Sequence, residues 1–293
     1  MLWPIVAVLC AAVFAVTNIL DKYTITKLVK DPSLNVLAQF LIVLFAVSIV
    51  LIHGLQSLST INIMLGLIAG ILDSAAIFIY FNAAKLDEIS RVLPMWYLDT
   101  IFIAILALFF LNEVFSISTY MGIVLMLIGV TLISIKKLER PKFSRAMALM
   151  LLASIFTAIA AVITKYLLGY ADYLSVLTYV LFGYALFLLP LFYLNFEKVK
   201  LLIEKNRRGL VMLIFKEGIT TFATLLYIFA ASVGPVTLVN ALTSTQPLFV
   251  LVFATLISAI YPKFLKEELK GSNLILKFIA VILIIVSAYL IAV

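Results

Sequence analysis

The sequence predicts an all-α integral membrane protein whose ten transmembrane helices form two inverted five-helix repeats. Three observations lead to this prediction: an apolar composition, ten long apolar runs, and residues that recur in the same order in the two halves. Apolar residues make up 66% of the 293 residues and charged residues 12%, against about 45–50% and about 25% in soluble domains. So few charges cannot solvate a protein surface, and we therefore expect lipid to cover much of it.

Each apolar run is long enough to cross a bilayer as a helix, which takes about 20 residues. The runs lack the short alternating segments of barrel strands, and only helices satisfy their own backbone hydrogen bonds in lipid. The expected spans are 3–21, 32–53, 61–84, 89–111, 117–135, 146–168, 173–194, 209–231, 236–260 and 273–293. Charged stretches connect them, and the longest are 136–145 and 197–208.

The two halves of the chain, residues 1–138 and 139–293, carry similar residues at corresponding places, which indicates an internal duplication. Five is an odd number of spans, so the halves must insert in opposite senses and enclose a site near the midplane. Rocking of one half against the other could expose that site to each side in turn. The corresponding pairs are Lys22 and Lys165, Tyr80 and Tyr227, Pro94 and Pro247, and Glu113 and Glu267.

Basic residues predict the orientation of the spans. With ten spans, both termini share one face, which carries Lys165 but almost none of the other basic residues. The opposite face carries nearly all the other basic residues, among them the clusters at 136–145 and 198–208. The positive-inside rule places that basic face in the cytoplasm and both termini outside. Basic residues in these short gaps indicate lipid headgroups rather than nucleic acid as their partner.

Two aspartates inside spans are the leading candidates for chemistry, because an ionisable group in a membrane is costly unless it has a function. Asp73 is about 18 Å deep in span 3 and Asp99 about 15 Å deep in span 4, at 1.5 Å per residue. The two could share one layer at the midplane and bind protons, since burial disfavours the charged carboxylate. The alternative is a structural aspartate bonded to Ser74, Thr100 or a nearby cation.

Further polar side chains could line a pathway for a substrate or an ion. Glu217, Thr220, Thr221 and Thr224 share one face of span 8, although the threonines could instead bond their own helix, and Lys216 could snorkel towards the headgroups. Asn240 and Ser244 share a face of span 9 with Pro247, and Pro247 and Pro94 each free a carbonyl from its helical bond. The other candidates are Asn18, Tyr80 and Trp96.

Several classes of site have no motif in the sequence. Cys10 is the one cysteine and His53 the one histidine, which argues against a disulfide, a thiolate metal site or a histidine base. Neither a P-loop nor the signatures of zinc proteases and serine hydrolases occur. We therefore predict no metal, no cofactor, no ATP-driven pumping and no enzymatic activity.

Several short segments resemble the drug/metabolite transporter superfamily, in its ten-helix EamA-like branch. These are the run 83–94, the ending Phe109–Glu113, the pair Gly122 and Gly129, the segments 246–249 and 262–267, and Asn18 with Lys22. The resemblance implies one EamA-like repeat in each half and export or exchange of amino acids, sugars or similar metabolites. Gln39 stands where the family often has an arginine, and span 10 lacks a glycine pair. The family also implies cytoplasmic termini, against the charge bias, which we keep as the prediction.

The predicted function is therefore a secondary transporter or exporter of a small metabolite, in the cell membrane, with proton coupling as a further hypothesis. A flippase for a lipid-linked sugar is the alternative within transport. A membrane-embedded enzyme that modifies lipids is a less favoured class, because it would need clustered acidic residues and histidines at the interface. The expected partners are a small-molecule substrate and membrane lipids.

Overall fold

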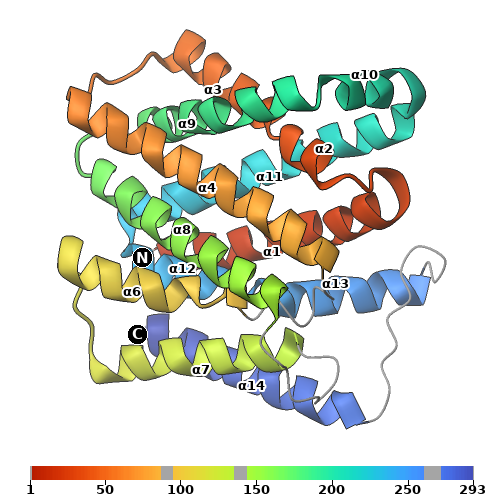
Figure 1. Cartoon of the computed structure of the whole chain (residues 1–293). Helices are drawn as coiled ribbons and strands as arrows, with labels where there is room; N and C mark the ends of the chain where they lie inside the picture. Colours follow the sequence, from red (N-terminus) through yellow and green to blue (C-terminus); the bar gives the residue numbers. More distant parts are fainter. Residues whose placement is uncertain (1, 87–94, 135–143, 261–271, 293) are drawn as a thin grey trace.

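The computed structural model describes residues 2–86, 95–134, 144–260 and 272–292. Every regular element in those ranges is a helix. The helices lie side by side with roughly parallel axes, and both termini lie at the same end of the molecule (Figure 1). The first half contains α1 (Trp3–Tyr23), η1 (Thr24–Leu28), α2 (Pro32–Leu37), α3 (Phe40–His53), α4 (Thr60–Leu86), α6 (Asp99–Phe110) and α7 (Ile117–Ser134). The second half contains α8 (Arg145–Leu167), α9 (Tyr173–Leu194), α10 (Phe196–Lys205), α11 (Arg207–Val233), α12 (Val236–Thr243), α13 (Gln246–Ile260) and α14 (Ser272–Ala292).

Within the described ranges, seven helical stretches are long and apolar enough to cross a membrane. Three shorter apolar helices, Asp99–Phe110, Ile117–Leu132 and Leu276–Ile291, accompany them. Each predicted span overlaps one of these helical regions, although the start of the span at 89–111 lies outside the described residues. The all-helical fold is therefore confirmed, whereas the number of ten membrane crossings stays a prediction.

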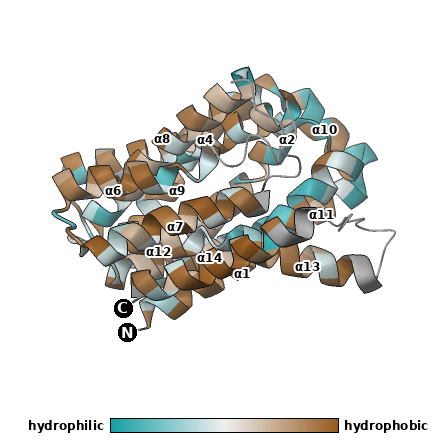
Figure 2. Ribbon diagram, turned by 90° about the horizontal axis from the view of Figure 1, so that it is seen from below, coloured by the Kyte–Doolittle hydropathy of each residue, from teal (hydrophilic) through white to brown (hydrophobic). Residues whose placement is uncertain are grey.

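Large apolar side chains cover much of the outer surface. Leu51, Ile52 and Ile117 are each at least 80% exposed, as is Tyr193. Hydrophobic residues extend along most helices, while hydrophilic residues gather around α10 and the neighbouring ends of α2 and α11 (Figure 2). Exposed apolar surface on this scale marks a contact with membrane or protein, and the apolar composition favours lipid.

Three predicted spans are interrupted within the described residues, and one of them is span 4, which breaks at Tyr97 and Leu98. Span 2 consists of α2 and α3, which are separated at Ala38 and Gln39, and span 9 consists of α12 and α13, which are separated at Ser244 and Thr245. The interruption of span 9 precedes Pro247, whose ring cannot accept the regular helical geometry upstream. Pro94, the corresponding proline of span 4, lies outside the described residues.

The helix α10 was not predicted. The charged stretch 197–208 was expected to be a connection without an apolar run, but Phe196–Lys205 forms a helix. It is amphipathic, with Leu202 buried against Val29 and Leu213 and with its lysines exposed. Its length and polarity suit the membrane surface rather than a crossing.

Glycines allow two helix pairs to approach closely. A Cβ atom on Gly70 of α4 would lie 1.9 Å from the carbonyl oxygen of Val180 and 2.8 Å from the Cα atom of Gly183, both in α9. A Cβ atom on Gly129 of α7 would lie 2.9 Å from Ile284 of α14. Small residues at such crossings let backbones approach in the absence of a hydrophobic driving force.

Candidate functional site

A cavity of about 290 Å³ lies among the helices, and α1, α3, α4, α6, α8, α9, α11 and α12 all contribute side chains to it. This volume is near the lower end of that of small-molecule sites. Ten of the eleven polar and aromatic side chains predicted for a pathway line it: Asn18, Asp73, Tyr80, Trp96, Asp99, Glu217, Thr220, Thr224, Asn240 and Ser244. Thr221 does not line the cavity. Pro247 does not line it either, but the preceding residue, Gln246, does. Their roles in transport stay predictions.

Asp73 is held against the second half of the chain. The hydroxyl group of Tyr184 in α9 donates a hydrogen bond to the Asp73 carboxylate in α4. Next to it, Ser74 donates to the side-chain oxygen of Gln39 at a distance of 3.0 Å. Gln39 sits at the break between α2 and α3, so this bond fixes the interrupted helix to α4.

Asp99 belongs to a network that joins α6 to α12. It is the first residue of α6, where the positive end of the helix dipole favours a carboxylate. Thr100 donates to Asp99 at 3.2 Å, and the amide of Asn240 donates to the Thr100 hydroxyl at 3.0 Å. The hydroxyls of Thr100 and Ser244 are 3.2 Å apart. Asp99 thus has Thr100 as a partner, as the structural alternative expected. It also lines the cavity, as the functional prediction expected.

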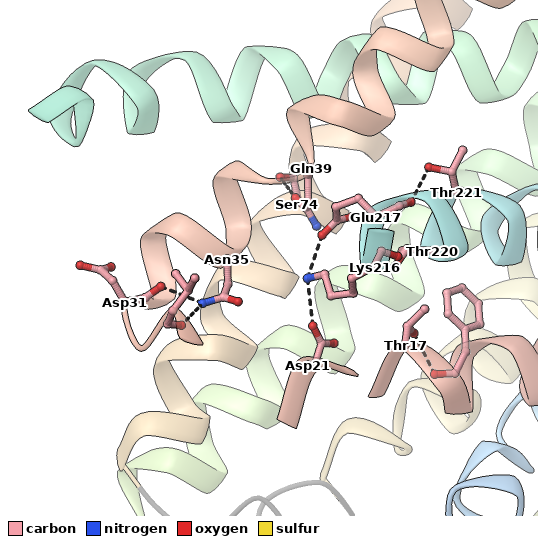
Figure 3. Close-up of polar contacts among 12 residues, drawn as sticks. Thr17, Asp21, Asp31, Asn35, Gln39, Ser74, Lys216, Glu217, Thr220 and Thr221 are labelled. Atoms are coloured by element: carbon pink, nitrogen blue, oxygen red, sulfur yellow. Dashed lines mark hydrogen bonds and ion pairs between the residues drawn. The ribbon is translucent and has the colours of Figure 1, made fainter. Parts of the chain in front are cut away.

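Lys216 lies at the centre of a buried ion cluster that was not predicted. Its Nζ atom is 2.9 Å from Asp21 Oδ1 in α1 and 2.8 Å from Glu217 Oε1, and its side chain is only 4% exposed. The same atom lies 5.6 Å from the ring centre of Phe81. The expectation that Lys216 snorkels to the surface is wrong, because two carboxylates hold the ammonium group inside (Figure 3).

The hydroxyl stripe of α11 bonds to its own helix. Thr220, Thr221 and Thr224 donate to the carbonyl oxygens of Lys216, Glu217 and Thr220, at 3.0, 2.7 and 3.0 Å. Thr220 and Thr224 still line the cavity. The alternative that these threonines satisfy their own helix is therefore correct for all three, and it is compatible with a polar wall.

Two charged side chains fix the connection between α11 and α12 at the end that carries the termini. The Glu113 carboxylate accepts hydrogen bonds from the backbone nitrogens of Val236 and Thr237, at 2.8 and 3.1 Å. Lys165 donates to the carbonyl oxygens of Ala231 and Gly234, at 2.7 and 2.8 Å. Each charge complements a helix end, an anion at the start of α12 and a cation at the end of α11.

Aromatic side chains and one unpaired hydroxyl complete the lining. The rings of Tyr80 and Trp96 meet edge to face with centroids 5.5 Å apart. The buried hydroxyl oxygen of Thr157 has no hydrogen-bond partner among the described residues. Elsewhere, the lone histidine, His53, lies 3.5 Å from Asp172 at the surface and away from the cavity. No three metal-binding side chains are grouped in the part of the chain that the structure describes.

Comparison with known families gives a direct result for the first half. Residues 1–135 match the EamA-like transporter family. The resemblance inferred from the sequence motifs is thereby confirmed. Together with the seven apolar helices, the match identifies a multi-pass membrane protein with an EamA-like transporter half. A comparison with curated proteins returned no match.

Solved structures include the same fold. One crystal structure aligns with 99% of this chain and 94% of its own, with a TM-score of 0.69 and 16% sequence identity. At that identity the similarity concerns the fold. Because it covers nearly the whole chain, the second half shares the architecture even though the family match ends at residue 135.

Proposed function

We propose that this chain is a secondary transporter that carries a small polar metabolite across the cell membrane by alternating access. The observation that carries the proposal is the central cavity, because helices from both halves line it with polar and ionisable side chains. A carrier needs such a shared site, since rocking of the halves can then expose it to either side. The EamA-like match of the first half supports transport rather than catalysis.

Two inverted repeats of five crossings each are part of the proposal. Exchange of the halves replaces α1 by α8, α4 by α11, α6 by α12 and α13, and α7 by α14. The extensive packing of α4 on α8 has its counterpart in that of α1 on α11, and α6 on α8 corresponds to α1 on α12 and α13. The pair α7 and α14 corresponds to itself. These equivalent contacts support a two-fold axis in the membrane plane.

One equivalent pair is unequal, and this inequality supports a conformational cycle. The helix α4 packs tightly on α9 at Gly70 and Gly183, whereas its counterpart, α11 on α3, is much less extensive. A structure with perfect two-fold symmetry would expose the cavity equally to both sides. We propose a second state, open to the other side of the membrane, in which the two packings are exchanged. In that state α11 packs closely on α3, and α4 moves away from α9.

Proton coupling through Asp73 and Asp99 is the second part of the proposal. Among the residues that the structure describes, no ion pair neutralises either carboxylate, whereas Asp21 and Glu217 share Lys216. A charged carboxylate without a cation is costly inside a membrane. Binding of a proton would thus compensate the charge when no substrate is present. The unpaired Thr157 hydroxyl offers a further polar contact to a substrate.

The orientation of the chain is also a proposal. The basic residues Lys198, Lys200, Lys205, Arg207 and Arg208 belong to α10 and the start of α11, at the end opposite to the termini (Figure 1). We propose that this end faces the cytoplasm. Protease or labelling access to a tag at either terminus of intact cells tests it.

The function is tested by flux into proteoliposomes. A panel of amino acids and sugars is offered with and without a pH gradient, to the wild type, Asp73→Asn, Asp99→Asn and the control Glu204→Gln, an exposed carboxylate on α10. We expect gradient-driven flux of at least one solute in the wild type and the control, and loss of the gradient dependence in both aspartate variants. Full gradient dependence in both variants contradicts proton coupling. Flux of no solute, together with scrambling of a lipid-linked sugar, contradicts the metabolite carrier and favours a flippase.

A further inference from the structure

A second cavity, separate from the central one, opens on the outside of the helices near the basic end. Its volume is about 770 Å³, and it shares no lining residue with the central cavity. One wall consists of Tyr23 and Leu28, at the end of α1 and in η1. The other wall is the start of α11, from Arg207 to Phe215. We call it the α1–α11 groove.

The charged end of the groove has no acidic partner in the ranges that the structure describes. Arg207 and Arg208 are both exposed, and neither forms an ion pair with a carboxylate among the described residues. They occupy the first turn of α11, which contains no acidic residue. Two cations at the positive end of a helix dipole are electrostatically unfavourable. An anion bound there would be stabilised by both the guanidinium groups and the dipole.

The rest of the groove is apolar and faces outwards. Val211 is 57% exposed and Phe215 60% exposed, and Met212 lies between them in the groove lining. Phe215 is seven residues beyond Arg208, which is about 10 Å along a helix towards the middle of the protein. A charged head above an apolar wall has the polarity of a phospholipid, whereas a free phosphate ion would gain nothing from the apolar side chains.

We propose that the α1–α11 groove binds an anionic phospholipid, with its phosphate on Arg207 and Arg208 and an acyl chain along Val211 and Phe215. Guanidinium groups bind phosphate oxygens through paired hydrogen bonds, and basic pockets at the ends of membrane helices attract anionic headgroups. The site depends on the membrane location of the protein and not on the proposed transport.

The groove lies against the buried ion cluster of the central cavity. Phe215 precedes Lys216, and Tyr23 follows Asp21 by two residues, so the helices that form the two walls are also joined by the ion pair of 2.9 Å. Asn206, which caps α11, donates to the carbonyl oxygen of Leu28 at 2.7 Å and ties η1 to the same helix. A lipid in the groove therefore holds α1 and α11 together and stabilises the folded protein.

The test is lipid binding by the purified full chain, measured by native mass spectrometry and by the unfolding temperature in neutral detergent. Dioleoylphosphatidylglycerol and dioleoylphosphatidylcholine are compared on the wild type, R207Q/R208Q and the control K200Q/K205Q. The control removes the same charge from the same end, on exposed residues of α10. We expect the wild type and the control to prefer the anionic lipid, and R207Q/R208Q to lose about tenfold to thirtyfold in affinity for it.

A third variant, Phe215→Ser, tests the apolar wall while both arginines remain. We expect weaker binding of both lipids with the preference for phosphatidylglycerol retained. The proposal is overturned if R207Q/R208Q and K200Q/K205Q bind phosphatidylglycerol equally well, if the wild type binds both lipids alike, or if glycerol phosphate alone raises the unfolding temperature as much as the whole lipid.

Discussion

Lys216 has two carboxylate partners and almost no contact with water, so its loss leaves charge without compensation. Replacement by methionine roughly keeps the length of the side chain but leaves the carboxylates of Asp21 and Glu217 without their cation. Removing one partner of a buried ion pair costs about 3–5 kcal/mol. We therefore expect Lys216→Met to lower the unfolding temperature of the purified protein clearly.

A triple variant provides the control for Lys216. In Asp21→Asn, Lys216→Met and Glu217→Gln combined, no charge stays unpaired, and a neutral replacement of a buried pair is often tolerated. The triple variant should recover much of the lost stability. A single variant as stable as the wild type would show that water reaches the cluster and that its charges are not buried.

Glu113 acts on the start of α12 through two backbone nitrogens. Replacement by glutamine removes the charge and one acceptor oxygen, and loss of a helix cap costs about 0.5–2 kcal/mol. We expect the amides of Val236 and Thr237 to exchange with solvent deuterium faster in Glu113→Gln. The exposed Glu204 provides the matched control, since Glu204→Gln should leave exchange at these amides unchanged. Equal exchange in all three proteins would contradict a capping role.

Single residues show where prediction from the sequence succeeds and where it fails. Asp73 and Asp99 were placed in one layer from their depth in the spans, and both line the central cavity. Snorkelling of Lys216 was offered as an alternative because depth alone does not reveal that Asp21, on another helix, lies opposite it. Thr157 and Tyr184 also line the cavity, but no charge, helix break or repeat distinguishes them in the sequence.

At the scale of elements, the crossing of α4 and α9 leaves no room for a side chain at Gly70. A methyl group there would meet the Val180 carbonyl oxygen at 1.9 Å, so Gly70→Ala must push the helices apart. We expect a marked loss of thermal stability and of any flux. Gly218 in α11 is the control, because a Cβ atom there has nothing within 4 Å. Gly218→Ala should be neutral or slightly stabilising, by up to about 1 kcal/mol through helix propensity.

A wild-type unfolding temperature in Gly70→Ala would contradict the close approach of α4 and α9.

The positions of the helices themselves were largely predictable, because apolar runs of about 20 residues leave the chain few alternatives in lipid. The break at Ala38 and Gln39 was not, since no proline marks it and the bond from Ser74 that holds Gln39 comes from a different helix. The amphipathic α10 was missed because its apolar face is too narrow to form a run.

At the scale of the whole molecule, the fold places helices of both halves around one cavity that carries polar and ionisable side chains. In the sequence, the proposed duplication rests on pairs such as Tyr80 and Tyr227, both of which line the cavity. The unequal packing of α4 on α9 and of α11 on α3 was not visible, because contacts between distant helices leave no local pattern in the sequence. A cycle that exchanges the two packings is the central claim of the proposed mechanism.

Access to a single cysteine in the cavity tests that cycle most directly. In a Cys10→Ala background, which removes the one native thiol, Thr224→Cys places a thiol in the cavity wall, and Thr221→Cys places one three residues away, outside the lining. Each protein is reconstituted in one orientation and exposed to a membrane-impermeant thiol reagent on either side. The mechanism predicts that Thr224→Cys reacts from both sides and Thr221→Cys from neither. Reaction of Thr224→Cys from one side only would contradict alternating access.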